Sequence, residues 1–307
     1  MHDLIIIGAG PAGLAAALYA GRFRMNTLVL EKMACGGQII LSSTIENYPG
    51  FPGGISTFDL IEKFKKQVED LGVPIENKEA LQIKPNLESG KISYEIKTQD
   101  SLLKAKSIIV ASGAQPKTLG IEGESKFLGK GVSYCGTCDG PLFRDKEVVV
   151  VGGGDRAIEE AIFLSSYAKK VFLVHRRAGF RAAKIVEDKA KANPKINFIL
   201  ESTIEGIFGG GKVEGVRIKN VKTNAIKELA VQGIFIFVGI IPNTLFLKGV
   251  VETDELGFIV TKHEMKASRE GIFACGDCCK KSLYQVVTAC GEGAIAADSA
   301  HKYLLNQ

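Results

Sequence analysis

Two cysteines separated by two residues, Cys135 and Cys138, lie in the polar, glycine-bearing segment YCGTCDGPLF (Tyr134–Phe143). This spacing lets two thiols close a small disulfide ring, and it also supplies half of a four-ligand zinc site. Asp139 directly follows the second cysteine, and its short side chain can move a proton as a disulfide opens. The pair alone does not decide between redox chemistry and metal binding, so the rest of the chain has to decide it.

A glycine-rich motif opens the chain, in DLIIIGAGPAGLAAALYAG. Gly8, Gly10 and Gly13 have the spacing G-x-G-x-x-G after an apolar run. In such a motif the glycines permit a tight turn, a close approach of the backbone to a pyrophosphate, and close packing of the following helix. The next apolar run, TLVLE, ends in Glu31, whose carboxylate can accept hydrogen bonds from both hydroxyls of an adenosine ribose. Together these features predict a Rossmann-like unit that binds FAD.

The same device recurs in EVVVVGGGDRAIEEAIFL, where Gly152, Gly154 and Ala157 have the spacing G-x-G-x-x-A after an expected strand over 147–151. The second copy ends in a basic cluster instead of an acid: His175, Arg176, Arg177 and Arg181. A carboxylate at this position would repel a ribose 2′-phosphate, whereas an arginine fork pairs with it. The second unit therefore suits NADPH better than NADH.

A second internal repetition indicates how the domains are connected. Ser107–Pro116 and Ile234–Asn243 are both apolar runs that end on a glycine, with a proline three residues later. Each predicts a strand that returns the chain from one nucleotide-binding unit to the other. Near the end of the chain, a long helix is expected to begin near Leu283. We predict an α/β fold with two Rossmann-like, three-layer nucleotide-binding domains, the second inserted in the first: residues 1–115 and 241–307 for FAD, and residues 116–240 for NADPH and the redox C-x-x-C.

Composition narrows the class of protein. The chain has 307 residues, enough for two domains, and a net charge of +5 without runs of like charge. With no nucleic-acid recognition motif, this mild excess does not indicate a nucleic-acid partner. The longest uncharged apolar stretch, Leu4–Gly21, contains Pro11 and several glycines and has no Lys or Arg before it, so we expect neither a membrane span nor an export signal. A cytoplasmic protein is expected.

The seven cysteines show no framework spacing, and they do not indicate a disulfide scaffold. A second C-x-x-C, Cys275 and Cys278, keeps a four-cysteine zinc site open, but such a site would lock the two predicted domains together. A flavin and a nicotinamide source in one chain instead complete a two-electron path from NADPH through FAD to a disulfide. This favours a redox pair at 135 and 138 and no metal. The remaining cysteines are expected to be small, partly buried residues: Cys275, Cys278, Cys279 and Cys290.

With these motifs in place, the sequence resembles the low-molecular-weight thioredoxin reductases over essentially its whole length. The resemblance is carried by GAGPAG, GGQI, IENYPGFP, ASGA, YCGTCDG, VVGGGDRAIEEA, HRRAGFRA and FACGD, in this order. It implies a homodimer of two-domain subunits that reduces thioredoxin, or a thioredoxin-like protein, with NADPH. It also implies that Cys138 faces the flavin and takes its electrons, that Cys135 forms a mixed disulfide with thioredoxin, and that Asp139 donates a proton.

The resemblance further implies which residues lie at each cofactor. For FAD they are Gly8, Gly10, Pro11, Ala12, Gly13, Glu31, Gly37, Gln38, Asn47, Ala111, Gly113, Asp277 and Gln285. For NADPH they are Gly152, Gly154, Asp155, Arg156, His175, Arg176, Arg177 and Arg181.

The chain departs from the family pattern at three positions. Arg156 replaces a Ser or Thr beside the expected pyrophosphate, Tyr284 replaces an Arg before the last helix, and Gly136 replaces the commoner Ala of the redox loop. Some relatives take electrons from ferredoxin, so a ferredoxin-dependent or other NADPH-independent flavin disulfide reductase is one alternative. A nucleotide-binding protein without turnover is another. The arginine cluster, which the ferredoxin-dependent relatives lack, favours NADPH.

Overall fold

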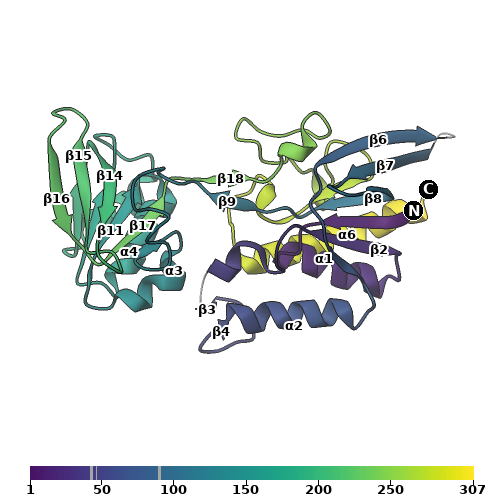
Figure 1. Ribbon diagram of the computed structural model, residues 1–307, viewed down its shortest axis with the longest axis horizontal. Helices are drawn as coiled ribbons and strands as arrows, with labels where there is room; N and C mark the ends of the chain where they lie inside the picture. Colours follow the sequence, from purple (N-terminus) through teal and green to yellow (C-terminus); the bar gives the residue numbers. More distant parts are fainter. Residues whose placement is uncertain (42–43, 46, 89–90) are drawn as a thin grey trace. The chain divides into compact units, whose positions relative to one another are not determined.

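The chain folds into two compact units (Figure 1). The computed structural model describes residues 1–41, 44–45, 47–88 and 91–307, with only the backbone described at residues 41, 44, 88, 91 and 137–138. Unit 1 consists of Met1–Gln115 and Ile241–Gln307, and unit 2 consists of Pro116–Ile240. The chain passes into unit 2 through β9 (Ala114–Pro116) and returns through β18 (Ile240–Pro242), and these two strands pair with each other.

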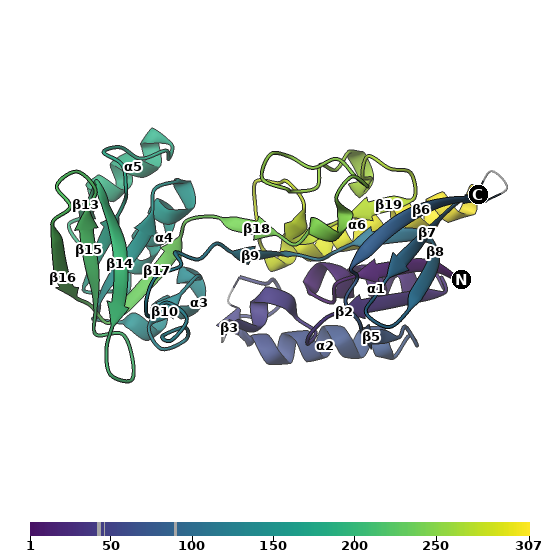
Figure 2. The ribbon, with the colours of Figure 1, turned by 45° about the horizontal axis from the view of Figure 1, so that its top comes forward.

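Unit 1 is built around a seven-stranded sheet, with strand order β5-β2-β1-β8-β7-β6 and β19 paired with the last residues of β8 (Figure 2). The strands are β1 (His2–Ile7), β2 (Thr27–Glu31), β5 (Ile75–Asn77), β6 (Gln82–Glu88), β7 (Lys91–Lys97), β8 (Leu102–Val110) and β19 (Ile272–Ala274). The central strands run parallel, and β6 and β7 extend the sheet as an antiparallel hairpin. Because the parallel strands are covered on both faces, β1 is a continuous apolar run rather than an alternating one.

Three helices cover this sheet: α1 (Pro11–Arg22), α2 (Thr57–Glu69) and α6 (Val286–Leu305). Helix α1 begins with a proline at its first turn, where the missing N–H costs no hydrogen bond. It packs against both α2 and α6. The approach to α6 is close, since a Cβ added to Gly293 would overlap the carbonyl oxygen of Ala12. This packing holds the N-terminal half of α6 beside the first turn of α1.

Helix α6 begins at Val286, three residues later than the sequence predicts. The reason is a capping box, in which Gln285 is the N-cap residue and its backbone N–H donates to the Thr288 hydroxyl at 3.2 Å. Leu283 therefore lies before the helix, and its carbonyl oxygen accepts a 3.2 Å hydrogen bond that the Thr288 hydroxyl donates.

Unit 2 contains a five-stranded parallel sheet with order β10-β17-β11-β12-β13 and a three-stranded antiparallel sheet with order β14-β15-β16. Its strands are β10 (Val132–Ser133), β11 (Glu147–Gly152), β12 (Lys170–Val174), β13 (Ile196–Ile199), β14 (Ser202–Phe208), β15 (Gly215–Asn220), β16 (Ile226–Ala230) and β17 (Gly233–Phe237). Its helices are α3 (Gly136–Asp139), α4 (Asp155–Ser165) and α5 (Lys184–Lys191). Strand β11 lies between β12 and β17, so the second glycine motif is central in the sheet.

Short elements complete the chain: β3 (Thr44–Ile45), β4 (Ile55–Ser56), and the 3₁₀ helices η1 (Gly37–Leu41), η2 (Gly140–Phe143), η3 (Leu245–Leu247), η4 (His263–Met265) and η5 (Gly276–Cys278). Of these, η5 directly follows β19 and so lies at the carboxyl edge of the unit 1 sheet. Within the described part of the chain, no helix has both the length and the apolar character needed to cross a membrane.

Candidate active site

The glycine loop of unit 1 lies at the carboxyl end of β1. A Cβ added to Gly8 would overlap the Ala111 carbonyl oxygen, and one added to Gly13 would overlap the Gly8 carbonyl oxygen. Gly8 also has φ +107°, which favours glycine. Gly10 differs, because its added Cβ would meet no described atom beyond its chain neighbours closer than 4.0 Å. Its backbone is therefore accessible at the start of α1, where helix N–H groups bind a pyrophosphate.

Glu31 is anchored at the end of β2 by two backbone groups. The Ala9 N–H donates to Glu31 Oε2 at 2.7 Å, and the Met33 N–H donates to Oε1 at 3.0 Å. Each carboxylate oxygen retains a lone pair for a ligand hydroxyl. A hollow of about 570 Å³ lies beside this carboxylate, lined in part by Met33 and Cys35. The arrangement fits a ribose bound beside Glu31.

Segments far apart in the sequence meet around this loop. A Cβ added to Gly37 would lie 3.4 Å from the Gly10 Cα, so the start of η1 faces the glycine loop. Asn47 Nδ2 donates a 2.9 Å hydrogen bond to Gln285 Oε1, across 238 residues of sequence. The Gly113 carbonyl accepts a 3.0 Å hydrogen bond from a backbone N–H of the returning chain. The other predicted residues lie in the same segments: Pro11 and Ala12 begin α1, Gln38 is in η1, and Ala111 follows β8.

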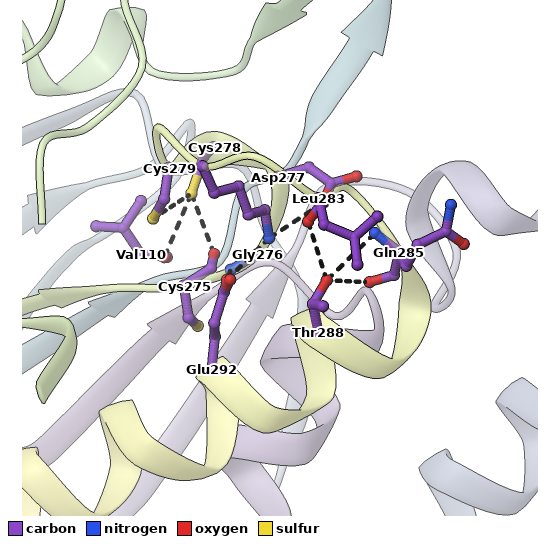
Figure 3. Close-up of polar contacts among 11 residues, drawn as sticks. Val110, Cys275, Gly276, Asp277, Cys278, Cys279, Leu283, Gln285, Thr288 and Glu292 are labelled. Atoms are coloured by element: carbon purple, nitrogen blue, oxygen red, sulfur yellow. Dashed lines mark hydrogen bonds and ion pairs between the residues drawn. The ribbon is translucent and has the colours of Figure 1, made fainter. Parts of the chain in front are cut away.

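The Gly276–Asp277 turn approaches the first turn of α1. Gly276 has φ +76°, and its added Cβ would lie 2.8 Å from the Ala12 Cβ. Its N–H donates a 2.8 Å hydrogen bond to Glu292 Oε2, from α6 (Figure 3). Lys281 Nζ lies 2.8 Å from the same oxygen and 3.5 Å from Asp277 Oδ1. Sequence reasoning selected Asp277 but missed Lys281 and Glu292, and no local signal distinguishes Lys281 from its neighbour Lys280.

The glycine loop of unit 2 resembles that of unit 1: one glycine has no room for a Cβ, and another leaves the backbone accessible. A Cβ added to Gly152 would lie 2.5 Å from both the Ala157 Cβ and the Phe237 carbonyl oxygen, whereas one on Gly154 would meet nothing within 4 Å. The backbone at Gly154 is therefore accessible at the start of α4, as Gly10 is at the start of α1. Asp155, the first residue of α4, accepts a 2.7 Å hydrogen bond from the backbone N–H of Ala183. That bond fixes the start of the helix.

The basic cluster of unit 2 divides into a buried and an exposed part. His175 is buried, and a Cβ added to Gly153 would overlap its ring. Burial, with the charges of Arg181 and Arg177, lowers the pKa of His175, so its ring is neutral near pH 7. Burial therefore disfavours a charged His175 ring, and a role for His175 at the cofactor stays a prediction. The positive charge comes from exposed side chains: Arg176, Arg177 and Arg181.

Arg156, the departure in the second glycine motif, lies in the first turn of α4. Its guanidinium carbon is 5.6 Å from the centre of the Phe237 ring, at the end of β17. Strand β17 neighbours β11 on the side opposite β12, which leads into the basic cluster. A cation–π contact therefore holds Arg156 on the β17 side of the loop.

The redox segment follows β10 and includes α3, whose N-cap residue is Cys135. Cys135 is disulfide-bonded, and the side chain of Cys138 lies outside the described part of the structure. The Cys135 N–H donates to the Ser133 hydroxyl at 3.0 Å, and that hydroxyl donates to Asp139 Oδ2 at 2.7 Å. Burial raises the pKa of Asp139, and the Ser133 hydrogen bond lowers it by less, so the net shift is upward. Sequence reasoning missed Ser133.

Gly136 faces a second carboxylate. An added Cβ would overlap the buried Oε2 of Glu160, from α4, and would lie 3.5 Å from the Leu164 Cγ. An alanine at this position requires the Glu160 carboxylate to move. The departure at Gly136 thus leaves room for this side chain.

Five described cysteines are free thiols: Cys35, Cys275, Cys278, Cys279 and Cys290. Cys275, Cys278 and Cys279 are buried in unit 1, and burial raises the pKa of the Cys275 thiol. The Cys278 thiol donates to the Cys275 carbonyl at 3.2 Å. These thiols pack as small apolar groups after β19, which agrees with the structural role expected for them.

Comparison with known proteins shows the family. A family model described as pyridine nucleotide-disulphide oxidoreductase matches residues 2–293. The chain belongs to this family. A thioredoxin reductase of Peptoclostridium acidaminophilum is 46% identical over 310 residues, covering 99% of this chain and 97% of that protein. This family membership makes the chain an oxidoreductase that uses a flavin and a pyridine nucleotide.

Solved structures agree with this assignment. The thioredoxin reductase from Streptococcus pyogenes MGAS5005 aligns with a TM-score of 0.86 at 43% identity, covering 100% of this chain and 99% of that one. A ferredoxin-flavin thioredoxin reductase from Clostridium acetobutylicum aligns with a TM-score of 0.53 at 32% identity, covering 100% and 99%. The predicted fold class and the resemblance to thioredoxin reductases are confirmed.

Proposed function

We propose that the chain is a thioredoxin reductase that passes electrons from NADPH through FAD and the Cys135–Cys138 disulfide to thioredoxin or a thioredoxin-like protein. The observation that carries the proposal is the presence, in one chain, of two accessible glycine loops and a disulfide-bonded Cys135 linked through Ser133 to Asp139. Relatives named thioredoxin reductase, matching over nearly their whole length, support the choice of acceptor.

The residues of unit 1 suit FAD. Glu31, held by two backbone N–H groups, binds the adenosine ribose, and the accessible backbone at Gly10 binds the pyrophosphate. Asp277, Asn47 and Gln285 bind the flavin end of the cofactor. Bound FAD supplies a two-electron carrier between a nicotinamide and a disulfide.

The residues of unit 2 suit NADPH. The backbone at Gly154 binds the pyrophosphate, and the exposed guanidinium groups bind the ribose 2′-phosphate as paired hydrogen-bond donors. The His175 ring packs against Gly153 and fills the space beside this residue of the glycine loop. Because the three arginines provide charge that NADH does not need, NADPH is the favoured donor.

The disulfide chemistry follows from the redox segment. Two electrons break the bond between Cys135 and Cys138, and Asp139 supplies a proton to a thiolate that forms. Burial raises the pKa of Asp139, which favours the protonated donor. The Cys135 thiolate then attacks the disulfide of the acceptor and forms a mixed disulfide. Attack by Cys138 on Cys135 releases the reduced acceptor and restores the disulfide.

A homodimer in the cytoplasm completes the proposal. Helix α6 exposes Val287 and Ile295, which are two turns apart on one face, and an apolar face of this kind suits a subunit interface. The five free thiols suit a reducing compartment. Light scattering on the purified protein measures the subunit number.

The test is a coupled assay with purified thioredoxin and two alternative electron donors, NADPH and reduced ferredoxin. The proposal predicts that NADPH supports the formation of thioredoxin thiols and that Cys135→Ser abolishes it. Thioredoxin reduction with ferredoxin alone would establish the alternative donor. If the flavin is reduced but no electrons reach thioredoxin, then thioredoxin is not the acceptor.

A further inference from the structure

A largely buried lysine, Lys281, lies beside the carboxylates of Asp277 and Glu292. Both acidic residues are labelled in Figure 3. Lys281 Nζ lies 2.8 Å from Glu292 Oε2 and 3.5 Å from Asp277 Oδ1. The Lys281 side chain is 11% exposed, that of Glu292 18%, and that of Asp277 33%. The ion pair with Glu292 is therefore largely shielded from water, whereas Asp277 retains an open side.

The groups around Lys281 favour its charged form. Burial alone lowers the pKa of this ammonium group, but the hydrogen bond and charge of Glu292, with the charge of Asp277, raise it above its ordinary value. The Nζ also lies 5.5 Å from the centre of the Tyr284 ring, the residue that replaces the arginine usual in the family. Lys281 thus supplies a cation in this part of the chain.

Lys281 contacts the Gly276–Asp277 turn in two ways, directly at Asp277 and indirectly through Glu292. Glu292 Oε2 accepts hydrogen bonds from both the Lys281 ammonium and the Gly276 N–H, at 2.8 Å each. Gly276 in turn contacts the first turn of α1 at Ala12. Fixing Glu292 therefore fixes the Gly276–Asp277 turn relative to the glycine loop, and the 3.5 Å contact orients Asp277 itself.

We propose that Lys281 is a positioning residue for the flavin, which holds Asp277 through Glu292 and sets both the affinity for FAD and the flavin midpoint potential. This inference rests on the proposed binding of FAD by unit 1. Without the ammonium group, the negative charges of Asp277 and Glu292 lose the cation that lies beside both, in a partly buried place. Their negative charge disfavours the reduced, more electron-rich flavin, so the potential becomes more negative.

The experiment compares Lys281→Met with Lys280→Met, an exposed neighbour of the same chemistry. Fluorescence titration of each apoprotein with FAD measures affinity, and dye equilibration of the FAD-saturated proteins measures the midpoint potential. We expect K281M to bind FAD about tenfold more weakly or worse, the range for a lost hydrogen bond to a charged group. K280M should match the wild type, and Lys281→Arg should restore both values.

A double variant separates positioning from general damage. Adding Glu292→Gln to K281M removes the uncompensated charge, so the double variant should regain part of the lost FAD affinity. Wild-type affinity and potential in K281M would overturn the inference while leaving the proposed function intact. A wild-type protein that does not bind FAD would instead reject the proposed function. If K281M fails to fold, two other variants test the proposal. Unchanged FAD affinity in K281R supports it. Unchanged FAD affinity and flavin potential in E292Q contradict it.

Discussion

The Ser133 hydroxyl lies 2.7 Å from the Asp139 carboxylate and donates a hydrogen bond to it. Ser133 is buried at the end of β10, and its hydroxyl also accepts the Cys135 backbone N–H. One side chain therefore fixes both the proposed proton donor and the first cysteine. This link makes the redox segment a single hydrogen-bonded unit rather than a cysteine pair with a nearby acid.

Ser133→Ala should move the pH profile of disulfide reduction. The Ser133 hydrogen bond lowers the pKa of Asp139 against the effect of burial, so its removal raises that pKa further. Since a proton donor acts in its protonated form, the alkaline limit should shift to higher pH while the maximal rate falls. Rapid-reaction measurement of thiol formation across pH tests this. Ser133→Thr, which keeps the hydroxyl, is the control, and an unshifted limit in S133A would contradict the account.

Arg176→Ala should change cofactor preference. The exposed guanidinium is proposed to pair with the 2′-phosphate, which NAD⁺ lacks. Loss of a charge-assisted hydrogen bond should weaken NADP⁺ binding about tenfold and leave NAD⁺ binding unchanged. Calorimetric titration with each nucleotide measures both affinities. Equal losses for NADP⁺ and NAD⁺ would place this arginine away from the 2′-phosphate.

Arg156→Ser should weaken the binding of NADP⁺ and of NAD⁺ by the same factor. Its guanidinium is held beside Phe237, on the side of the loop opposite the basic cluster, so we expect it to meet the shared pyrophosphate. The same titrations compare the two nucleotides. Tighter binding in the serine variant would show instead that Arg156 obstructs the groove.

Gly10→Ala and Gly13→Ala should fail in different ways. A Cβ on Gly13 overlaps the Gly8 carbonyl oxygen, so G13A should lose about 1–3 kcal/mol of folding stability. Gly10 has φ −73° and room for a Cβ, so G10A should fold normally but bind FAD weakly. Thermal unfolding of the apoproteins and FAD titration separate the two effects. Full FAD affinity in G10A would show that the loop does not carry the pyrophosphate.

Local patterns in the sequence predicted the parts of the site that depend on neighbouring residues. TLVLE predicted the strand that ends at Glu31, because an apolar run followed by an acid is a local signal. The two glycine motifs likewise predicted which positions need glycine and which leave the backbone accessible.

Contacts that depend on tertiary structure were beyond this reasoning. Asn47 and Gln285 are 238 residues apart, and no periodicity relates them. The ion pair of Lys281 with Glu292 forms because α6 passes beside the Gly276–Asp277 turn. The burial of His175 was not foreseen, because its neighbours in sequence are exposed arginines, whereas its own side chain is buried beside Gly153.

The most direct test of the account is an anaerobic titration of the FAD-loaded protein with NADPH, following flavin absorbance and counting thiols afterwards. The account predicts bleaching of the flavin near stoichiometric NADPH and the appearance of a new thiol pair, which Cys138→Ser does not gain. A flavin that dithionite bleaches but NADPH leaves oxidised would contradict the proposed path from NADPH to the disulfide.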